Sequence, residues 1–185
     1  MAREKQLVRY QVRSIGREVA DEVRAVLRAP DYGHPVHAEV ATGPAPCRVC
    51  LEKFVPGQER RLLLTYDPFR EVEPEQPLPG PIFIHETSCI PFAGEGLPAT
   101  LANDRLTLSA YGEDREPIDE TRTATAIDAA EALERLFANG ATQYVHARST
   151  PNGCFLCQFD RTEEIVPFVV ELRGGGRVIR RWARA

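Results

Sequence analysis

Short runs of alternating apolar and polar residues, each closed by a turn signal, recur along the sequence. RLTLSAY (105–111) is followed by Gly-Glu-Asp, and residues 116–126 can return beside it. TQYVHARS (142–149) is followed by TPNG, and CFLCQFDR (154–161) returns. A period of two is typical of strands with one buried face, and such turns join antiparallel neighbours. The sequence therefore predicts a largely antiparallel, twisted sheet.

Two helices and several further strands complete the expected fold. One helix is expected over 16–29, where apolar residues recur at helical spacing and Pro30 follows. The other begins near Asp128, which is expected to cap it, and ends at Asn139-Gly140 in a left-handed turn. Further strands are expected at residues 6–14, 36–41, 60–66 and 81–86, and on both sides of the glycine triplet 174–176. We therefore expect one α+β domain over residues 1–185.

Composition excludes several classes of protein. With 43% hydrophobic and 27% charged residues the chain is not expected to be disordered. No apolar run reaches the roughly 18 residues of a membrane span, and the first residues lack a secretory signal. We therefore expect a cytoplasmic protein without membrane association. The net charge of −4 makes nucleic acid an unlikely partner; whether the chain forms a homodimer stays open.

The five cysteines are the most informative side chains. An odd number in a reducing compartment argues against a disulfide framework and favours metal ligands, core residues or reactive thiols. Cys47 and Cys50 have the C-x-x-C spacing of a zinc knuckle, and His85 and Cys89 could complete a four-ligand site if the chain bends after residue 86. Leu51 stands where such knuckles usually carry glycine, which weakens the zinc hypothesis. Redox chemistry at this pair is less favoured, because the segment is too short for a helix.

The second C-x-x-C pair is interpreted differently. If residues 154–161 form a strand, the side chains of Cys154 and Cys157 point to opposite faces, about 10 Å apart, and cannot bind one ion. Cys157 would share its face with Phe155 and Phe159 in the core.

One sheet face is expected to carry polar side chains. Tyr144, His146 and Arg148 alternate along one strand, and the returning strand would place Gln158 and Asp160, or Cys154, beside them. Histidine is suited to proton transfer and arginine to binding an anion. The same residues could equally form an ordinary solvated or hydrogen-bonded surface.

Two irregular segments could cover such a face. Residues 67–81 contain five prolines and residues 87–100 lack periodicity; long loops are often lids or binding loops, although a plain surface loop is an equal alternative. The sequence contains no phosphate-binding loop, dinucleotide fingerprint, metalloprotease helix or nucleophile elbow.

The segments PCRVCLEKFVPGQERRLLLTYDPF, GPIFIHETSC and NGCFLCQFDR resemble a bacterial family of unknown function, DUF1203. The resemblance runs from about Pro46 to Arg161. It implies a small single-domain bacterial protein without an established reaction. It also directs attention to Cys47, Cys154 and the strand that carries His85, because Cys50 and Cys157 are not reliable parts of the family pattern.

These observations leave three functional hypotheses. The first is an enzyme or small-molecule-binding domain for a small polar or anionic metabolite, with His85 and His146 handling protons, Arg148 binding an anion, and Cys47 or Cys154 lining the site or acting as nucleophile. The second is a zinc-stabilised interaction module without catalysis, in which Cys47, Cys50, His85 and Cys89 hold the metal. The third is nucleic-acid contact through the arginine-rich tail, residues 177–185.

Overall fold

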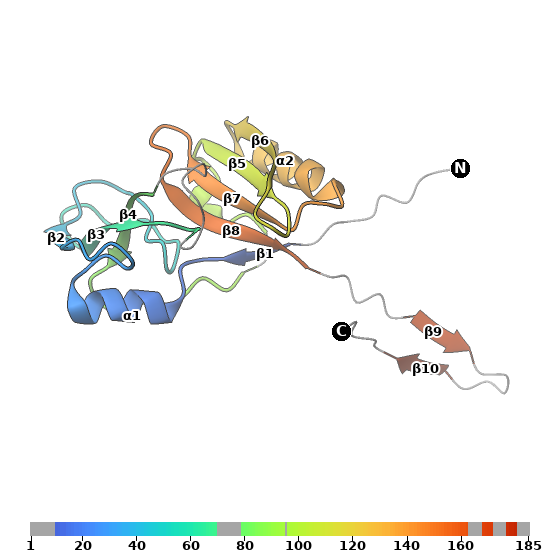
Figure 1. Cartoon of the computed structure of the whole chain (residues 1–185), viewed down its shortest axis with the longest axis horizontal. Coiled ribbons are helices and arrows are strands. Elements are labelled where there is room, and N and C mark those ends of the chain that lie inside the picture. Colours follow the sequence, from blue (N-terminus) through green and yellow to red (C-terminus); the bar gives the residue numbers. More distant parts are fainter. Residues whose placement is uncertain (1–9, 70–78, 95, 163–167, 172–176, 181–185) are drawn as a thin grey trace.

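The computed structural model describes residues 10–69, 79–94, 96–162, 168–171 and 177–180. Within them the chain forms two helices and antiparallel sheets, which confirms the expected α+β class (Figure 1). The largest sheet has five strands in the order β1-β8-β7-β5-β6, and a second sheet has the order β2-β3-β4.

The strands lie close to where the alternating patterns placed them. The five-stranded sheet consists of β1 (Tyr10–Arg13), β5 (Leu106–Tyr111), β6 (Pro117–Thr123), β7 (Tyr144–Ser149) and β8 (Phe155–Arg161). The three-stranded sheet consists of β2 (His37–Val40), β3 (Arg60–Tyr66) and β4 (Gly80–His85). β9 (Phe168–Glu171) and β10 (Arg177–Arg180) pair antiparallel on either side of the glycine triplet, as expected.

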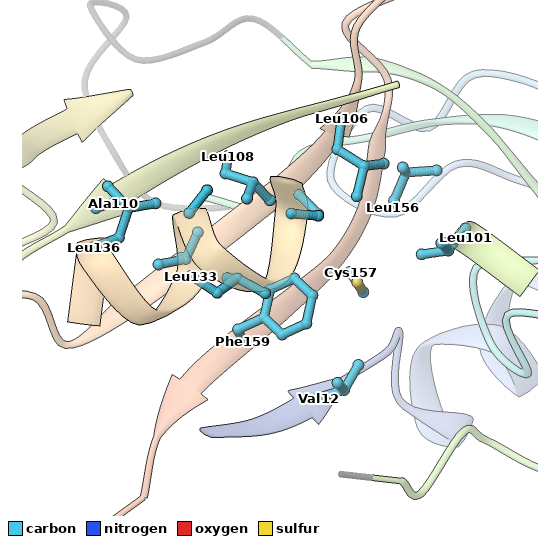
Figure 2. Packing of buried hydrophobic residues seen from close by; sticks show 14 of the residues in the cluster. Val12, Leu101, Leu106, Leu108, Ala110, Leu133, Leu136, Leu156, Cys157 and Phe159 are labelled. Atoms are coloured by element: carbon cyan, nitrogen blue, oxygen red, sulfur yellow. The ribbon is translucent and has the colours of Figure 1, made fainter. Parts of the chain in front are cut away.

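Helix α2 (Ala126–Ala138) packs on one face of the five-stranded sheet. Its buried Leu133, Leu136 and Phe137 meet apolar side chains of β5, β7 and β8. Figure 2 shows this core, with Cys157 and Phe159 pointing into it. The expectation that Cys157 is a core residue is confirmed, since it is completely buried.

The ends of α2 differ from the prediction. Thr125, not Asp128, is the N-cap: its hydroxyl accepts from the Asp128 amide, and the Asp128 carboxylate accepts from the Thr125 amide. This capping box satisfies two amides that would otherwise lack partners. The helix ends at Asn139 with extended rather than left-handed backbone.

Helix α1 (Arg17–Val26) and the three-stranded sheet enclose a second core. Ala20 and Val23 of α1 pack with Leu62 of β3 and with Ile82 and Ile84 of β4. The helix ends sooner than predicted, because Leu27 adopts a left-handed conformation with φ 51°.

β8 joins the two cores. The register of β7 and β8 shifts between Ala147 and Arg148, so that Arg148 lies opposite Phe155. Leu156 and Cys157 therefore belong to the α2 core while Phe155 belongs to the second core. The prediction that Phe155 shares a face with Cys157 is wrong, because this bulge interrupts the alternation.

Several sequence expectations concern segments that are only partly described. Residues 70–78 of the 67–81 loop, and Arg181, Trp182 and Arg184 of the tail, lie outside the described residues. Residues 87–100 are irregular and end in a 3-10 turn, η1 (Ala99–Leu101), apart from residue 95, which is not described. Within the described residues, each helix is too short or too polar to cross a membrane.

Candidate metal centre

Residues 47–51 form a tight turn that brings the first two thiols together. The amide of Leu51 donates to the carbonyl of Cys47 at 2.9 Å, and the amide of Cys47 donates to the carbonyl of Glu52 at 2.8 Å. Leu51 has φ 61°, the left-handed conformation that glycine adopts without steric cost. The bend that the sequence appeared to disfavour is therefore present, with leucine in the position of glycine.

The other two residues of the cluster come from the end of β4. His85 is the last residue of this strand, and the chain then turns so that Cys89 comes back toward Cys47. The amide of His85 donates to Sγ of Cys47 at 3.4 Å. Backbone hydrogen bonds from Arg48 to Phe83 and from Phe92 to Val49 hold the two segments side by side.

Cys47, Cys50, His85 and Cys89 form one compact cluster. Their four potential ligand atoms all lie within 4.8 Å of one another. The Sγ atoms of Cys47 and Cys89 are 3.9 Å apart, and Sγ of Cys50 is 3.6 Å from Nδ1 of His85.

These separations match the edges of a zinc tetrahedron. With Zn–S near 2.3 Å and Zn–N near 2.0–2.1 Å, tetrahedral geometry places two sulfurs roughly 3.8 Å apart and a sulfur and a nitrogen roughly 3.6 Å apart. Both observed separations therefore suit a single shared ion.

Ionisation of Cys47 disfavours ionisation of the neighbouring thiols Cys50 and Cys89. The pKa of Cys47 is lowered to about 4, chiefly by a hydrogen bond from the Cys50 thiol and also by the amides of Val49 and His85. The pKa of Cys50 is raised, mainly because its proton is held by Cys47, and that of Cys89 is raised mainly by burial. A bound divalent cation would remove this conflict, since it favours the thiolate form of each cysteine.

Two charged residues, Glu59 and Arg24, contact the candidate metal ligands from outside the cluster. Oε1 of Glu59 lies 3.5 Å from Nε2 of His85, on the opposite side of the ring from Nδ1. Arg24 of α1 donates to the carbonyl of His85 at 3.1 Å and to Sγ of Cys89 at 3.7 Å. A carboxylate behind a histidine ligand fixes its tautomer, and a donor to a thiolate disperses its charge. Sequence reasoning missed both residues, because nothing in their spacing connects them to the cysteines.

The remaining predicted site residues lie elsewhere. His146 and Arg148 are buried on the face of β7 that turns away from α2, where Nε2 of His146 lies 2.9 Å from Oε1 of Gln158. Cys154 lines a separate cleft of about 840 Å³, together with Arg48 and Arg61. The five residues predicted as catalytic therefore do not converge: Cys47 and His85 belong to the metal-ligand cluster, His146 and Arg148 to the sheet face, and Cys154 to neither.

The chain was compared with known families, curated proteins and solved structures. The model of the family described as "Protein of unknown function (DUF1203)" matches residues 44–161. The matched segment includes all four cluster residues, together with β7 and β8. Neither the curated proteins nor the solved structures gave a match.

Proposed function

Since this chain belongs to the DUF1203 family, whose description names no activity, we propose a function from the geometry of its own residues: it is a zinc-binding protein with one structural zinc site. Cys47, Cys50 and Cys89 would bind the ion as thiolates, and His85 would bind it through Nδ1. Three sulfurs and one imidazole form a ligand set typical of structural zinc.

The convergence of four ligand atoms within 4.8 Å carries this proposal. Two of them come from a turn, one from the end of β4 and one from the segment that follows it, and the paired residues are 35 and 42 positions apart in the chain. Four cysteine and histidine side chains brought together from such distant segments suggest a common ligand. The carboxylate of Glu59 behind His85 supports a metal rather than a group of buried thiols.

The ligand set favours a structural over a catalytic ion. Four protein ligands complete the tetrahedron and leave no position for water or substrate. Cys47 is completely buried and the side chain of His85 is 14% exposed, so solvent has little access from their side. The same burial argues against Cys47 as a nucleophile and against His85 as a proton carrier.

The zinc would fasten the 47–50 turn to β4. The turn itself contacts several elements: the carbonyl of Arg48 accepts from the amide of Ile15, and its guanidinium donates to the carbonyl of Phe155 in β8. An ion at this point would therefore stabilise the junction of both cores. The alternative hypothesis of a zinc-stabilised module agrees with this role.

Metal analysis tests the proposal. Protein purified without added zinc is expected to contain one zinc per chain, and cobalt substitution should produce the visible bands of a tetrahedral thiolate site. Cys50→Ser and Cys89→Ser should reduce the bound zinc, whereas Cys154→Ala, which removes a thiol outside the cluster, should not. Metal-free protein that melts at the temperature of the zinc-loaded protein would overturn the structural role; we expect a decrease of roughly 10 °C.

A further inference from the structure

A polar chain of side chains crosses the sheet face opposite α2. The guanidinium of Arg13 makes two contacts with the Asp160 carboxylate, at 2.9 and 3.0 Å. The same carboxylate accepts from Nε2 of Gln158 at 2.6 Å, and Oε1 of Gln158 faces Nε2 of His146 at 2.9 Å. These residues lie side by side because β8 pairs with both β1 and β7.

This series of hydrogen bonds determines which ring nitrogen of His146 carries the proton. The carboxylate can only accept, so the amide of Gln158 must direct its NH₂ toward Asp160 and its oxygen toward His146. Nε2 of His146 must therefore carry the hydrogen, and Nδ1 of the neutral ring has a free lone pair. Burial keeps the ring neutral, since it lowers the pKa of His146 to about 3.

Nδ1 of His146 is buried without a hydrogen-bond partner among the described residues. His146 is only 1% exposed. Its ring is surrounded by four aromatic rings whose centroids lie 4.6 to 5.2 Å away: Phe69, Tyr111, Tyr144 and Phe155. A buried acceptor without a donor is unfavourable, which suggests that a ligand or water provides one.

Arg148, two residues further along the same face, has buried hydrogen-bond donors that lack acceptors among the described residues. It is 5% exposed, and only its Nη1 atom has a described partner, the carbonyl of Gly153 at 3.1 Å. Nε and Nη2 are buried and have no hydrogen-bond partner in the part of the chain that the structure describes. These two nitrogens form one edge of the guanidinium, the edge that binds a carboxylate with two parallel hydrogen bonds. Residues i and i+2 of a strand lie about 7 Å apart on one face, so one small molecule can reach both side chains.

A cleft of about 640 Å³ opens at this place. His146, Gln158 and Asp160 line it, and Tyr66, Phe69, Tyr144 and Phe155 contribute aromatic walls. Arg148 does not line this cleft but lies two residues from His146, on the same face of β7. A ligand would therefore place its charged end deepest and its apolar part in the cleft.

We propose that this face binds a small carboxylate that carries a neighbouring hydroxyl group and an apolar or aromatic body. The carboxylate pairs with Nε and Nη2 of Arg148, the hydroxyl donates to Nδ1 of His146, and the apolar body lies against Phe69 and Tyr144. This site shares no residue with the zinc cluster.

Three related probes test the proposal on the zinc-loaded full chain by calorimetry. Mandelate carries the carboxylate, the hydroxyl and a ring; phenylacetate lacks the hydroxyl, and mandelamide lacks the negative charge. We expect saturable binding of mandelate at one site, and binding at least roughly tenfold weaker for the other two, because each lacks a hydrogen bond to a buried polar group.

Variants locate the binding. Arg148→Gln should weaken mandelate binding by roughly tenfold or more, and His146→Phe should remove the preference for mandelate over phenylacetate. Arg105→Gln, which removes an exposed arginine of the other cleft, is the matched control and should bind mandelate as the wild type does. If Arg148→Gln does not fold, Arg148→Lys keeps the charge but loses the paired donors, and should show the same loss.

The zinc content of each variant, measured in parallel, separates this proposal from the previous one. No saturable binding of mandelate, equal binding of all three probes, or unchanged binding by the Arg148 variants would overturn it. The first result would mean that ordered water alone satisfies His146 and Arg148.

Discussion

Glu59 and His85 form a carboxylate–imidazole pair at the edge of the cysteine cluster, with Oε1 of Glu59 3.5 Å from Nε2 of His85. The pair orients the ring so that Nδ1 points toward the thiols, 3.6 Å from Sγ of Cys50. The other carboxylate oxygen of Glu59 accepts from the amide of Val55 at 2.6 Å, so its position is fixed by the backbone. A residue that touches none of the thiols thus helps to shape their site.

Glu59→Gln is therefore expected to weaken zinc binding by roughly 10- to 100-fold, because the amide supports the histidine tautomer less well than a carboxylate. Competition with a chromophoric chelator measures the affinity. Glu52→Gln is the control, since this exposed side chain has no described contact with the cluster. Equal affinities of the two variants would show that Glu59 has no role in the site.

The conformation of Leu51 predicts an unusual order of stability for the alanine and glycine variants at this position. Its side chain is completely buried while its backbone has φ 61°. Leu51→Ala should cost about 2–5 kcal/mol of unfolding free energy through the cavity it leaves. Leu51→Gly loses the same contacts but regains roughly 1–2 kcal/mol of backbone strain, so it should be no less stable than Leu51→Ala.

Urea unfolding of the zinc-loaded variants measures this difference. Leu106, equally buried but in β5, provides the comparison. There the glycine variant should be less stable than the alanine variant, because glycine has the greater backbone entropy to lose. The same order at both positions would contradict the role assigned to the Leu51 conformation.

The neutral, buried ring of His146 predicts a loss of stability in acid. The unfolded chain takes up a proton near pH 6.5, whereas the folded chain does so only near pH 3, because burial, opposed in part by Gln158 and aided by Arg148 and Arg13, lowers the pKa. Above pH 6.5 the ring is neutral in both states and contributes no pH dependence. Below it, the unfolding free energy should fall by about 1.4 kcal/mol per pH unit until about pH 3.

His146→Phe isolates this contribution, since it keeps an aromatic ring but cannot titrate. Zinc release in acid affects both proteins, so the difference between their unfolding free energies, followed from pH 7 to pH 4, is the informative quantity. A difference that stays constant over this range would show that His146 is not the group responsible.

The capping box of α2 predicts a local effect. Thr125→Ala removes the hydroxyl that accepts from the Asp128 amide and should lower the unfolding free energy by about 0.5–2 kcal/mol. Zinc content should not change, because α2 contributes none of the four cluster residues. Ile127→Ala, at a side chain 72% exposed, should alter stability by less than about 0.5 kcal/mol, and thermal melts compare the two.

The alternating patterns located the strands well but did not reveal every pairing register between them. Alternation located β3, β5 and β7 to within about a residue or two, because each buries one face. It could not reveal the bulge at Arg148 and Phe155, since a shift of register depends on the partner strand. The cap was misplaced at Asp128 because a capping box contains two residues that can each serve as cap.

The candidate site was visible only in part. The spacing of Cys47 and Cys50 suggested a knuckle, but Leu51 obscured it, since leucine carries no sequence signal for the left-handed conformation that this residue adopts. The approach of Cys89 to Cys47 depends on the turn that follows β4, which has no pattern in the sequence. On the sheet face, alternation correctly grouped Tyr144, His146 and Arg148, while the unsatisfied nitrogens of His146 and Arg148 follow only from packing.

The separation of the two halves of the cluster affects how the protein matures. Cys50 and His85 are 35 residues apart, with β3 between them, so the second pair of ligands reaches the first only when this part of the chain has folded. Nascent chains would thus bind the ion late, after this folding step. When the metal is scarce, some molecules would be folded but would contain no zinc. Cellular zinc supply, rather than the rate of synthesis, would then determine how much durable protein accumulates.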